Sequence, residues 1–344
     1  MHPKCVLTID GQPVSGLFWE RLIQVTVTDK EGTRSDTIDF QFEAGTPFVA
    51  LPRKKSIIQC WLGYAETGIE FMGKFEADEV ELEFLPYQIH VQGKSADVRG
   101  KLKQHREKHW DNQTFGGVVG ELAKEAGLKA QVAPRIAQFR GKDGYFAIGG
   151  ESPLHWIERH AQRLDGLFAI KNGNLIVADK GAGQTPGGGA VGALVITPPM
   201  VIEGTGKVKF TSRDTHKKVK AGYHDHKDAK RKHETADADP KGEADYTMRH
   251  TYANKAEAKQ AATARAKELQ RSADSTGVTI EGNPYAKGGV PFSYAGIHPE
   301  VDGMPFIIET ATHTFSKGPA YLTAIQGKAK KTQASGGSGK SGGK

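Results

Sequence analysis

The chain has 344 residues, with 47 Lys and Arg against 40 Asp and Glu and a formal net charge of +7 at pH 7. Because a single hydrophobic core stops growing at about 250 to 300 residues, this length predicts several small domains, each with its own core. A basic excess this small favours solubility with some attraction to polyanions, and it argues against a protein dedicated to binding nucleic acid.

Residues 4–93 alternate between apolar and polar side chains, as the strands of a half-buried sheet do. Turns rich in Gly, Asp, Pro or charge separate seven short β-branched or aromatic runs, at 5–9, 22–27, 37–42, 57–64, 69–75, 80–85 and 87–91. So many short strands predict a barrel or sandwich, here a first domain over residues 1–100. Runs such as 25–28 and 39–42 also keep a polar second face, which would meet solvent in a monomer.

A small mixed α/β domain is expected at residues 101–150. Its clearest signal is a set of apolar residues that repeat at helical spacing and end at Gly127: Phe115, Val118, Val119, Leu122 and Ala126. This pattern predicts an amphipathic helix packed on another element. Residues 128–150 hold scattered apolar residues with Gly and Pro, which is compatible with short strands.

The segment 151–179 predicts a helix and a tight β-hairpin, which make a third domain at 151–185. Ser152 is a good N-cap, Pro153 suits the first helical position, and Gly166 follows where a left-handed residue often ends a helix. The buried face should consist of the apolar residues at helical spacing, Leu154, Ile157, Ala161 and Leu164. Asn172 and Gly173 tolerate the positive φ angles of a type I′ turn, so strands are expected on either side of them.

A Gly-rich break at 181–192 marks the boundary of the last domain, a second β-rich unit over residues 186–328. Strands are expected at 194–196 and 207–211. Asn254 and Glu257 have capping-box spacing and open a helix expected at 254–276, whose stripe of small Ala side chains permits close approach to a sheet. The Gly, Ser and Lys tail at 329–344 has no apolar anchor and predicts disorder.

The cysteines and the hydropathy pattern bear on the compartment. Cys5 and Cys60 each lie in an apolar run typical of a strand, which predicts buried free thiols in a reducing cytoplasm. A disulfide between them is the alternative if the two strands are neighbours. No window reaches 18 apolar residues and no apolar segment follows a basic start. We therefore expect neither a membrane span nor a signal peptide, and no membrane partner.

Two stretches of the chain carry features of a known family. The first comprises Glu151-Ser152, Leu154, the helix face Ile157, Arg159 and Ala161, and Gly166. The second comprises Asn283-Pro284-Tyr285, Gly296, Val301-Asp302-Gly303, residues 306–309, Thr312-His313-Thr314-Phe315 and Gly318. With the β-rich N-terminus, they resemble the phage late control gene D family of contractile-tail baseplate hubs, related to the T4 baseplate hub and to the hub module of type VI secretion spike proteins. The chain departs from that family at Pro153, Trp156 and His160, where an acid, an aromatic and a leucine are more usual.

The resemblance implies a mainly β fold, in which two tube-like antiparallel β-barrel domains flank two small peripheral α+β domains. It implies a homotrimer whose six barrels form a pseudo-sixfold ring, adapting the sixfold tail tube to the threefold central spike. The implied partners are the central spike protein, the tail tube protein and, as a further candidate, the tape-measure protein, with DNA only in transit through the lumen. The implied place is the baseplate of a phage or phage-like tail, after synthesis in the host cytoplasm.

A basic run is the strongest candidate for contact with a polyanion. Between residues 213 and 233, eight Lys and Arg stand against three Asp, a local net charge of +5. Because charge is the main term in non-specific DNA binding, the run could line a lumen or form a nucleic-acid site, and a solvated hairpin is the structural alternative. The candidate residues are Lys217, Lys218, Lys220, Lys230, Arg231 and Lys232.

Other patterns that resemble active sites have simpler structural explanations. His216, His224, His226 and His233 share this polar segment, and a metal site there requires the fold to converge them. Acids at 79, 81 and 83 alternate along a strand, which indicates one acidic face and not the paired carboxylates of a glycosidase. The glycines at 181–189 lack the Gly-Lys-Ser/Thr of a phosphate-binding loop. His313 is expected to be packed in the core or at an interface, and no metal or cofactor is expected.

The sequence therefore predicts a structural baseplate hub and not an enzyme. Two alternatives belong to other functional classes. One is a cell-wall-active or peptidoglycan-binding tail protein, although no segment is left over to encode such a module. The other is a non-specific nucleic-acid-binding protein that uses residues 213–233, which steep salt dependence of DNA binding would favour. A phage, a tail-like bacteriocin and a defective prophage are not distinguished by these patterns.

Overall fold

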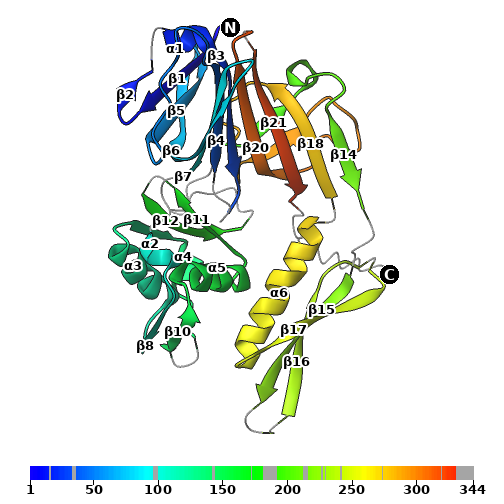
Figure 1. The fold of residues 1–344 in the computed structure, drawn as a ribbon. Coiled ribbons are helices and arrows are strands. Elements are labelled where there is room, and N and C mark those ends of the chain that lie inside the picture. Colours follow the sequence, from blue (N-terminus) through cyan, green and yellow to red (C-terminus); the bar gives the residue numbers. More distant parts are fainter. Residues whose placement is uncertain are drawn as a thin grey trace.

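The computed structural model describes residues 1–14, 17–32, 36–95, 100–141, 144–171, 173–180, 192–211, 216–225, 228, 230–240, 242–272, 274–318 and 320–330. The chain is mainly β, as predicted. The described residues form a 13-stranded sheet and three smaller sheets of two, three and three strands (Figure 1). Among these residues, no helix combines the length and apolar character needed to cross a membrane.

The N-terminal half supplies one side of the large sheet. Its strands pair in the order β3-β4-β7-β6-β5-β1-β2 and bury one apolar face. The elements are β1 (Pro3–Ile9), β2 (Gln12–Pro13), α1 (Leu17–Arg21), β3 (Leu22–Lys30), β4 (Thr37–Glu43), β5 (Ile57–Tyr64), β6 (Gly68–Glu83) and β7 (Gln88–Ser95). The two strands expected at 69–75 and 80–85 are one long strand, β6, because a bulge between Ala77 and Glu79 bends it without ending its pairing.

The two cysteines lie on neighbouring strands of this half. Leu7 of β1 stands opposite Cys60 of β5, and Cys5 stands opposite Leu62, so the two cysteines are offset by two residues. Both thiols are buried and free. Burial raises the pKa of the Cys60 thiol well above its usual value, so this side chain behaves as a small apolar residue of the core.

The C-terminal half continues the same sheet. Its elements are β13 (Leu194–Ile196), the 3-10 helix η2 (Pro198–Met200), β14 (Lys207–Phe210), β18 (Asp274–Glu281), β19 (Pro291–Tyr294), β20 (Phe306–Ser316) and β21 (Ala320–Ala329). Strand β20 pairs with β3, with His313 opposite Val27, so both ends of the chain share one sheet. Among the described strands, no pairing closes either half into a barrel, and the two barrels stay a prediction. The tail expected from residue 329 overlaps β21, whose Ala329 is buried; residues 331–344 lie outside the description.

The segment between the halves forms a compact α+β unit, seen beneath the N-terminal strands in Figure 1. Its elements are α2 (Gly100–Lys103), β8 (Arg106–Trp110), α3 (Phe115–Glu125), β9 (Lys129–Val132), α4 (Pro134–Ala137), β10 (Phe146–Glu151), α5 (Pro153–Arg163), β11 (Gly166–Lys171) and β12 (Asn174–Asp179). The predicted apolar face of α3 is buried, and Thr114 caps the helix by accepting the N–H of Gly117 at 3.1 Å. Residues on both sides of the boundary expected at 150/151 share one core, from Leu102 to Val177.

The helix and hairpin expected at 151–179 are confirmed, with one correction. The left-handed residue after α5 is Asp165, with φ of 55°, and not Gly166. Gly166 is the first residue of β11. A glycine is required there because the space beside it is filled: a Cβ would lie 2.8 Å from Cδ1 of Ile136 and 3.0 Å from the carbonyl oxygen of Ala161. Gly173 has the expected positive φ of 75°, and Asn172 lies outside the described residues.

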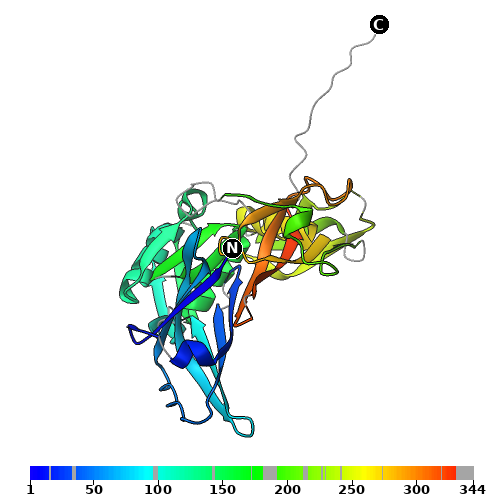
Figure 2. The same cartoon turned by 90° about the horizontal axis from the view of Figure 1, so that it is seen from above.

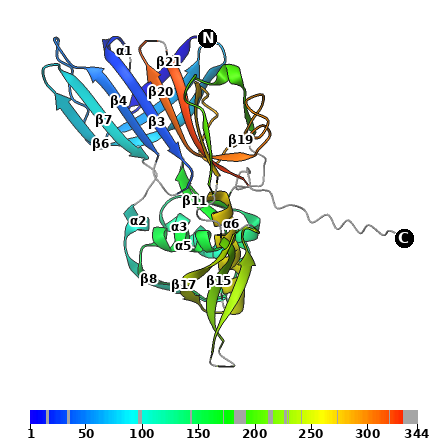
Figure 3. The same ribbon diagram turned by 90° about the vertical axis from the view of Figure 1, so that its right-hand side faces the viewer.

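A second small unit is inserted in the C-terminal half. It consists of β15 (His216–Asp225), β16 (Lys230–Asp237), β17 (Ala244–Tyr252) and α6 (Lys255–Ser272), and helix α6 covers one face of the three strands (Figures 1 and 3). Asn254 is the N-cap, as its spacing from Glu257 predicted, since its side chain accepts the N–H of Glu257 at 2.9 Å. The Glu257 carboxylate accepts from the side-chain amide of Asn254 at 3.0 Å. The helix ends at Ser272, earlier than expected, because Asp274 already begins β18. This unit has a core of its own inside the range 186–328.

Candidate functional site

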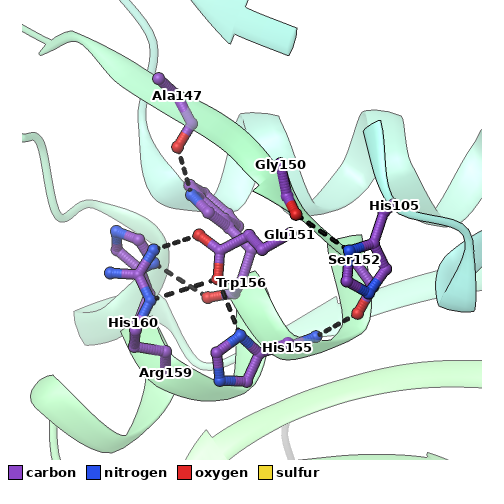
Figure 4. Close-up of polar contacts among 9 residues, drawn as sticks. All are labelled: His105, Ala147, Gly150, Glu151, Ser152, His155, Trp156, Arg159 and His160. Carbon is purple, nitrogen blue, oxygen red and sulfur yellow. Dashed lines mark hydrogen bonds and ion pairs between the residues drawn. The ribbon is translucent and has the colours of Figure 1, made fainter. Parts of the chain in front are cut away.

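The segment that resembles the hub family lies at the start of α5 and is held by a compact polar cluster (Figure 4). Ser152 accepts the N–H of His155 at 3.3 Å, as an N-cap should. The carboxylate of Glu151 accepts from Nδ1 of His155 at 2.8 Å and forms an ion pair with Arg159. Burial opposes ionisation of Glu151, but hydrogen bonds and positive charge from Arg159 and His155 hold its pKa below the ordinary value. These contacts fix the helix to the end of β10, and the carboxylate of Glu151 is occupied by His155 and Arg159.

The family departures on α5 are packed into the core. Trp156 is fully buried, and its indole N–H donates to the carbonyl of Ala147 at 2.8 Å. The ring of His160 lies 4.1 Å from that of Trp156, and its Nδ1 is 2.9 Å from the Trp156 carbonyl. Burial lowers the pKa of His160 to about 4, so the imidazole is neutral at pH 7. Pro153 is also buried. The cluster therefore builds structure, and its groups show no pairing of a nucleophile with a base.

Helix α5 also connects its unit to the unit of α6. The Arg163 guanidinium lies 5.4 Å from the ring centre of Tyr252, and its Nη2 is 3.1 Å from Nε2 of His250. Asp165, just after the helix, pairs with Lys267 of α6 at 3.4 Å. A cation over an aromatic face contributes roughly 0.5–1 kcal/mol when exposed and more when desolvated. The two small units are thus joined by polar contacts.

A buried charge triad ties the first small unit to both halves of the large sheet. Lys171, at the end of β11, reaches Asp29 of β3 at 2.9 Å and Asp36 at 3.1 Å. Asp29 also accepts the N–H of Gly288 at 2.9 Å, and Asp36 accepts that of Lys30 at 2.9 Å. Burial opposes the charge of Lys171, but the two carboxylates hold its pKa above the ordinary value. Burial, and then the charge of Asp29, raises the pKa of Asp36 to about 6.

A cleft of about 700 Å³ lies where the large sheet and the two small units meet. Its walls mix both signs of charge, with Lys30 and Glu309 on the sheet side and Arg265 and Glu268 on α6. His216 lies here as well, its ring 5.4 Å from that of Tyr246. The cleft is thus an open junction between units with walls of mixed charge.

The six candidate basic residues lie on the β15–β16 hairpin, and three of them are paired. Lys218 lies 3.8 Å from Asp237, Lys220 lies 2.7 Å from Asp245, and Lys232 lies 2.7 Å from Asp225 and also contacts Asp228. Lys217, Lys230 and Arg231 are exposed. The basic run is therefore a hairpin with acids among its basic residues, as the structural alternative to a polyanion site predicted. Contact with a polyanion stays a prediction. Arg213 and Lys227 lie outside the described residues.

The histidines do not converge on a metal site within the described chain. No group of three or more His, Cys, Asp or Glu there could hold a metal ion, and His226 is not described. On the sheet, His233 stands opposite Gly222 and His224 stands opposite Arg231. His313 of β20 is fully buried, with Nε2 3.0 Å from the Ala286 carbonyl and Nδ1 3.0 Å from the Tyr321 hydroxyl. Burial lowers the pKa of His313 to about 4, as suits the packed histidine expected there.

Sequence reasoning missed the charge triad and the contacts between units. Nothing in the local pattern marks Lys171, since its two partners lie about 140 residues away in the chain. The only sequence signal is Lys171 itself, a charge that ends an otherwise apolar strand. A lysine at the end of a strand can equally be exposed to solvent, so the partners of Lys171 become evident only from the fold.

Comparisons with known proteins agree with this architecture. The family described as phage tail baseplate hub (GPD) matches residues 64–318. A probable baseplate hub protein of Escherichia phage 186 is 26% identical over 95% of this chain and 92% of its own length. The corresponding protein of Escherichia phage P2 is 30% identical over 57% of this chain, a match that spans only 50% of that relative.

A solved structure shows the same fold at low identity. The tail protein from Neisseria meningitidis MC58 superposes with a TM-score of 0.70, at 10% identity, over 95% of this chain and 97% of that one. The family match includes both stretches that resemble hub proteins, the α5 segment and the last strands of the large sheet. Since it extends over well more than half of the chain, this protein belongs to the phage tail baseplate hub family.

Proposed function

We propose that the protein is the homotrimeric hub of a contractile phage or phage-like tail, and that it adapts the sixfold tail tube to the threefold central spike. The observation that carries this proposal is the continuous sheet formed by the two ends of the chain through β3 and β20. Two β-rich halves per chain, in three copies, offer six comparable walls to a sixfold tube, while the true symmetry stays threefold.

The second face of this sheet supports a role as the wall of a channel. Around the joint, Thr26 stands opposite Thr314 and Thr28 opposite Thr312, and none of these side chains is buried. The other face carries the buried apolar residues, such as Val25 and Val27. The same face continues through Asp39, which stands opposite Thr26, and through Glu79 of β6, so it is polar and also carries fixed negative charge. We infer that this face lines the lumen.

The partners follow from this arrangement. One end of the trimeric ring would bind the tail tube protein and the other the central spike protein, with the tape-measure protein as a further candidate in the lumen. Strand pairing and apolar burial between copies would hold the ring, without chemistry by the protein itself. The protein would be made in the host cytoplasm and carried in the baseplate.

The mass of the assembled protein tests this proposal. Light scattering at micromolar concentration should give three times the chain mass of 37.2 kDa for the protein alone or, after addition of its spike protein, the mass of three chains plus the bound spike. A monomer under both conditions would exclude the homotrimeric hub.

A further inference from the structure

The turn between β6 and β7 presents large apolar side chains to solvent. Phe84 is 74% exposed and Leu85 is 81% exposed. Phe48, from the loop after β4, packs its ring against Tyr87 with 5.3 Å between centroids and is 69% exposed. We call these four residues the apolar tip. Exposed apolar clusters of this kind are typical of protein interaction sites.

The backbone of the tip is strained at its most exposed residue. Leu85 has φ of 59°, in the left-handed region that Gly adopts freely and that residues with a Cβ avoid. Within one copy, neither the strained backbone nor the exposed side chain of Leu85 stabilises the fold. Backbone strain of this sort is typical of functional positions, where the unusual conformation holds a side chain in place to bind a partner.

A complementary surface lies at the other end of the large sheet. It is a hollow of about 260 Å³, whose apolar walls include Val201, Val208, Phe210, Val278, Tyr294 and Ile297. Phe210 is 55% exposed and Ile297 is 41% exposed. We call this surface the β14 hollow. Small-molecule pockets usually measure about 300–1,000 Å³, so the β14 hollow is better suited to one or two inserted side chains.

Charges of opposite sign lie beside the two surfaces, although the hollow also has an acid nearby, since Asp274 stands opposite Phe210. Glu79, Glu81 and Glu83 are exposed along β6 and lead up to the apolar tip. Lys207 lines the β14 hollow, and Lys209 is exposed on the same strand. Opposite charges at the rims favour the encounter of two surfaces and fix their orientation, while apolar contact at the centre supplies most of the affinity.

The topology places these surfaces where successive copies can meet. Strand β14 ends the pairing path of the large sheet on one side, and β6 lies near the other end of that path, beyond β3, β4 and β7. Figures 1 and 2 show the two strands on opposite sides of the molecule. Two different but complementary patches on one chain make a head-to-tail contact, which closes into a ring when the rotation between copies permits.

We propose that the apolar tip of one copy docks into the β14 hollow of the next copy, with Leu85 as the inserted side chain. This inference rests on the proposed homotrimer and gives it a specific contact. The occupant is a second copy because an exposed apolar tip, an apolar hollow and charges of opposite sign beside them occur on the same chain. A foreign partner, such as the tube or the spike, would bind one surface and leave the other unexplained.

Leu85→Gly separates a binding role from a structural one. Glycine relieves the strained φ, so the melting temperature of the subunit should stay the same or rise. The concentration needed for half assembly should rise at least about tenfold, since truncation of a central anchor residue commonly has this effect. Lys55→Gly is the matched control, because Lys55 is also exposed and has φ of 69° but lies outside the tip. It should leave assembly unchanged.

A mixing experiment tests the head-to-tail geometry, with Phe210→Asp as the variant of the hollow. Each variant alone should be monomeric by light scattering where the wild type is trimeric. The Leu85→Gly copy keeps an intact hollow and the Phe210→Asp copy an intact tip, so an equimolar mixture should form dimers with one copy of each. Persistent trimers of either variant, or a mixture that stays monomeric, would overturn this contact and leave the hub proposal standing. A wild type that is monomeric alone and with spike protein would instead overturn the hub proposal.

Discussion

The charge triad makes a quantitative prediction about Asp36. One lysine, Lys171, faces two carboxylates, and Asp29 alone can neutralise it, so the second carboxylate is an excess charge in a buried place. Lys74 and Lys287 line the adjoining cavity, where the ammonium of Lys287 donates to the Phe71 carbonyl at 3.1 Å. Replacing Asp36 with Asn keeps an oxygen for the N–H of Lys30 and removes the excess charge. We expect Asp36→Asn to be more stable than the wild type at neutral pH.

The magnitude follows from the pKa of Asp36, which is raised from 3.8 to about 6. Because the pKa of Asp36 is higher in the folded state, this group stabilises the fold when the pH is below its pKa in the unfolded state. That stabilisation is lost as the pH rises through its pKa in the folded state. The wild type should therefore lose stability between pH 4 and pH 6 through this group. A difference of about two in pKa corresponds to roughly 3 kcal/mol. Asn does not titrate, so the variant should escape most of this loss.

Urea unfolding at pH 4.0 and pH 7.5 measures the effect. Asp36 also raises the pKa of Lys171, so the difference between Asp36→Asn and the wild type reports on the charge triad, whereas titrating residues away from the triad contribute equally to both. The variant should be favoured at pH 7.5 and nearly equal to the wild type at pH 4.0. Asp78→Asn is the control: Asp78 is exposed and paired with Lys94, which lowers its pKa, so its removal should not raise stability at pH 7.5. A variant that is less stable than the wild type at pH 7.5, or a difference independent of pH, would refute the reasoning.

Three further predictions concern α5, the basic hairpin and the C-terminus. Ile157→Asp should destabilise the first small unit by several kcal/mol because Ile157 is fully buried, whereas Ile157→Val should cost about 0.5–1.5 kcal/mol; thermal unfolding compares them. Changing Lys217, Lys218, Lys220, Lys230, Arg231 and Lys232 to Gln should leave assembly intact by light scattering, and sequence-selective DNA binding at physiological salt by the unmodified protein would contradict the hub proposal. A chain that ends at Lys330 should fold and assemble normally, since Ala329 is the last buried residue of the described chain; loss of assembly would show that residues 331–344 contribute a contact.

The elements predicted best are those with redundant local signals. At α5, the N-cap, the first-position proline and the apolar spacing all indicate the same helix, and the structure places it at Pro153–Arg163. The N-cap of α6 and the face of α3 were predicted for the same reason. The prediction failed at Gly166, where a residue chosen for its φ angle turned out to be required by a close approach to Ile136. The two uses of glycine look the same in sequence.

Long-range pairing was beyond the reach of local patterns. The pairing of β3 with β20 joins residues almost 300 positions apart, and neither strand carries a mark of its partner. The strand pattern gave the mainly β class and the polar second face correctly, but it did not show that strands from both ends of the chain share one sheet. Likewise, the basic run is a hairpin whose lysines pair with acids from outside the run, such as Asp237 and Asp245. The net charge counted over residues 213–233 therefore overstates the positive charge that is not neutralised by a neighbouring acid.

The contacts between units differ in kind from those within them. The cores of the two small units and of the two halves of the sheet are separate apolar clusters, whereas the links named above are ion pairs and a cation over a ring. Polar interfaces of this kind resemble transient ones, which permit adjustment between domains. The joint between β3 and β20 is the exception, because a continuous backbone ladder connects the two halves of the sheet. The rigid connection of the chain therefore lies in this ladder, whereas the two small units are attached by polar contacts that can rearrange.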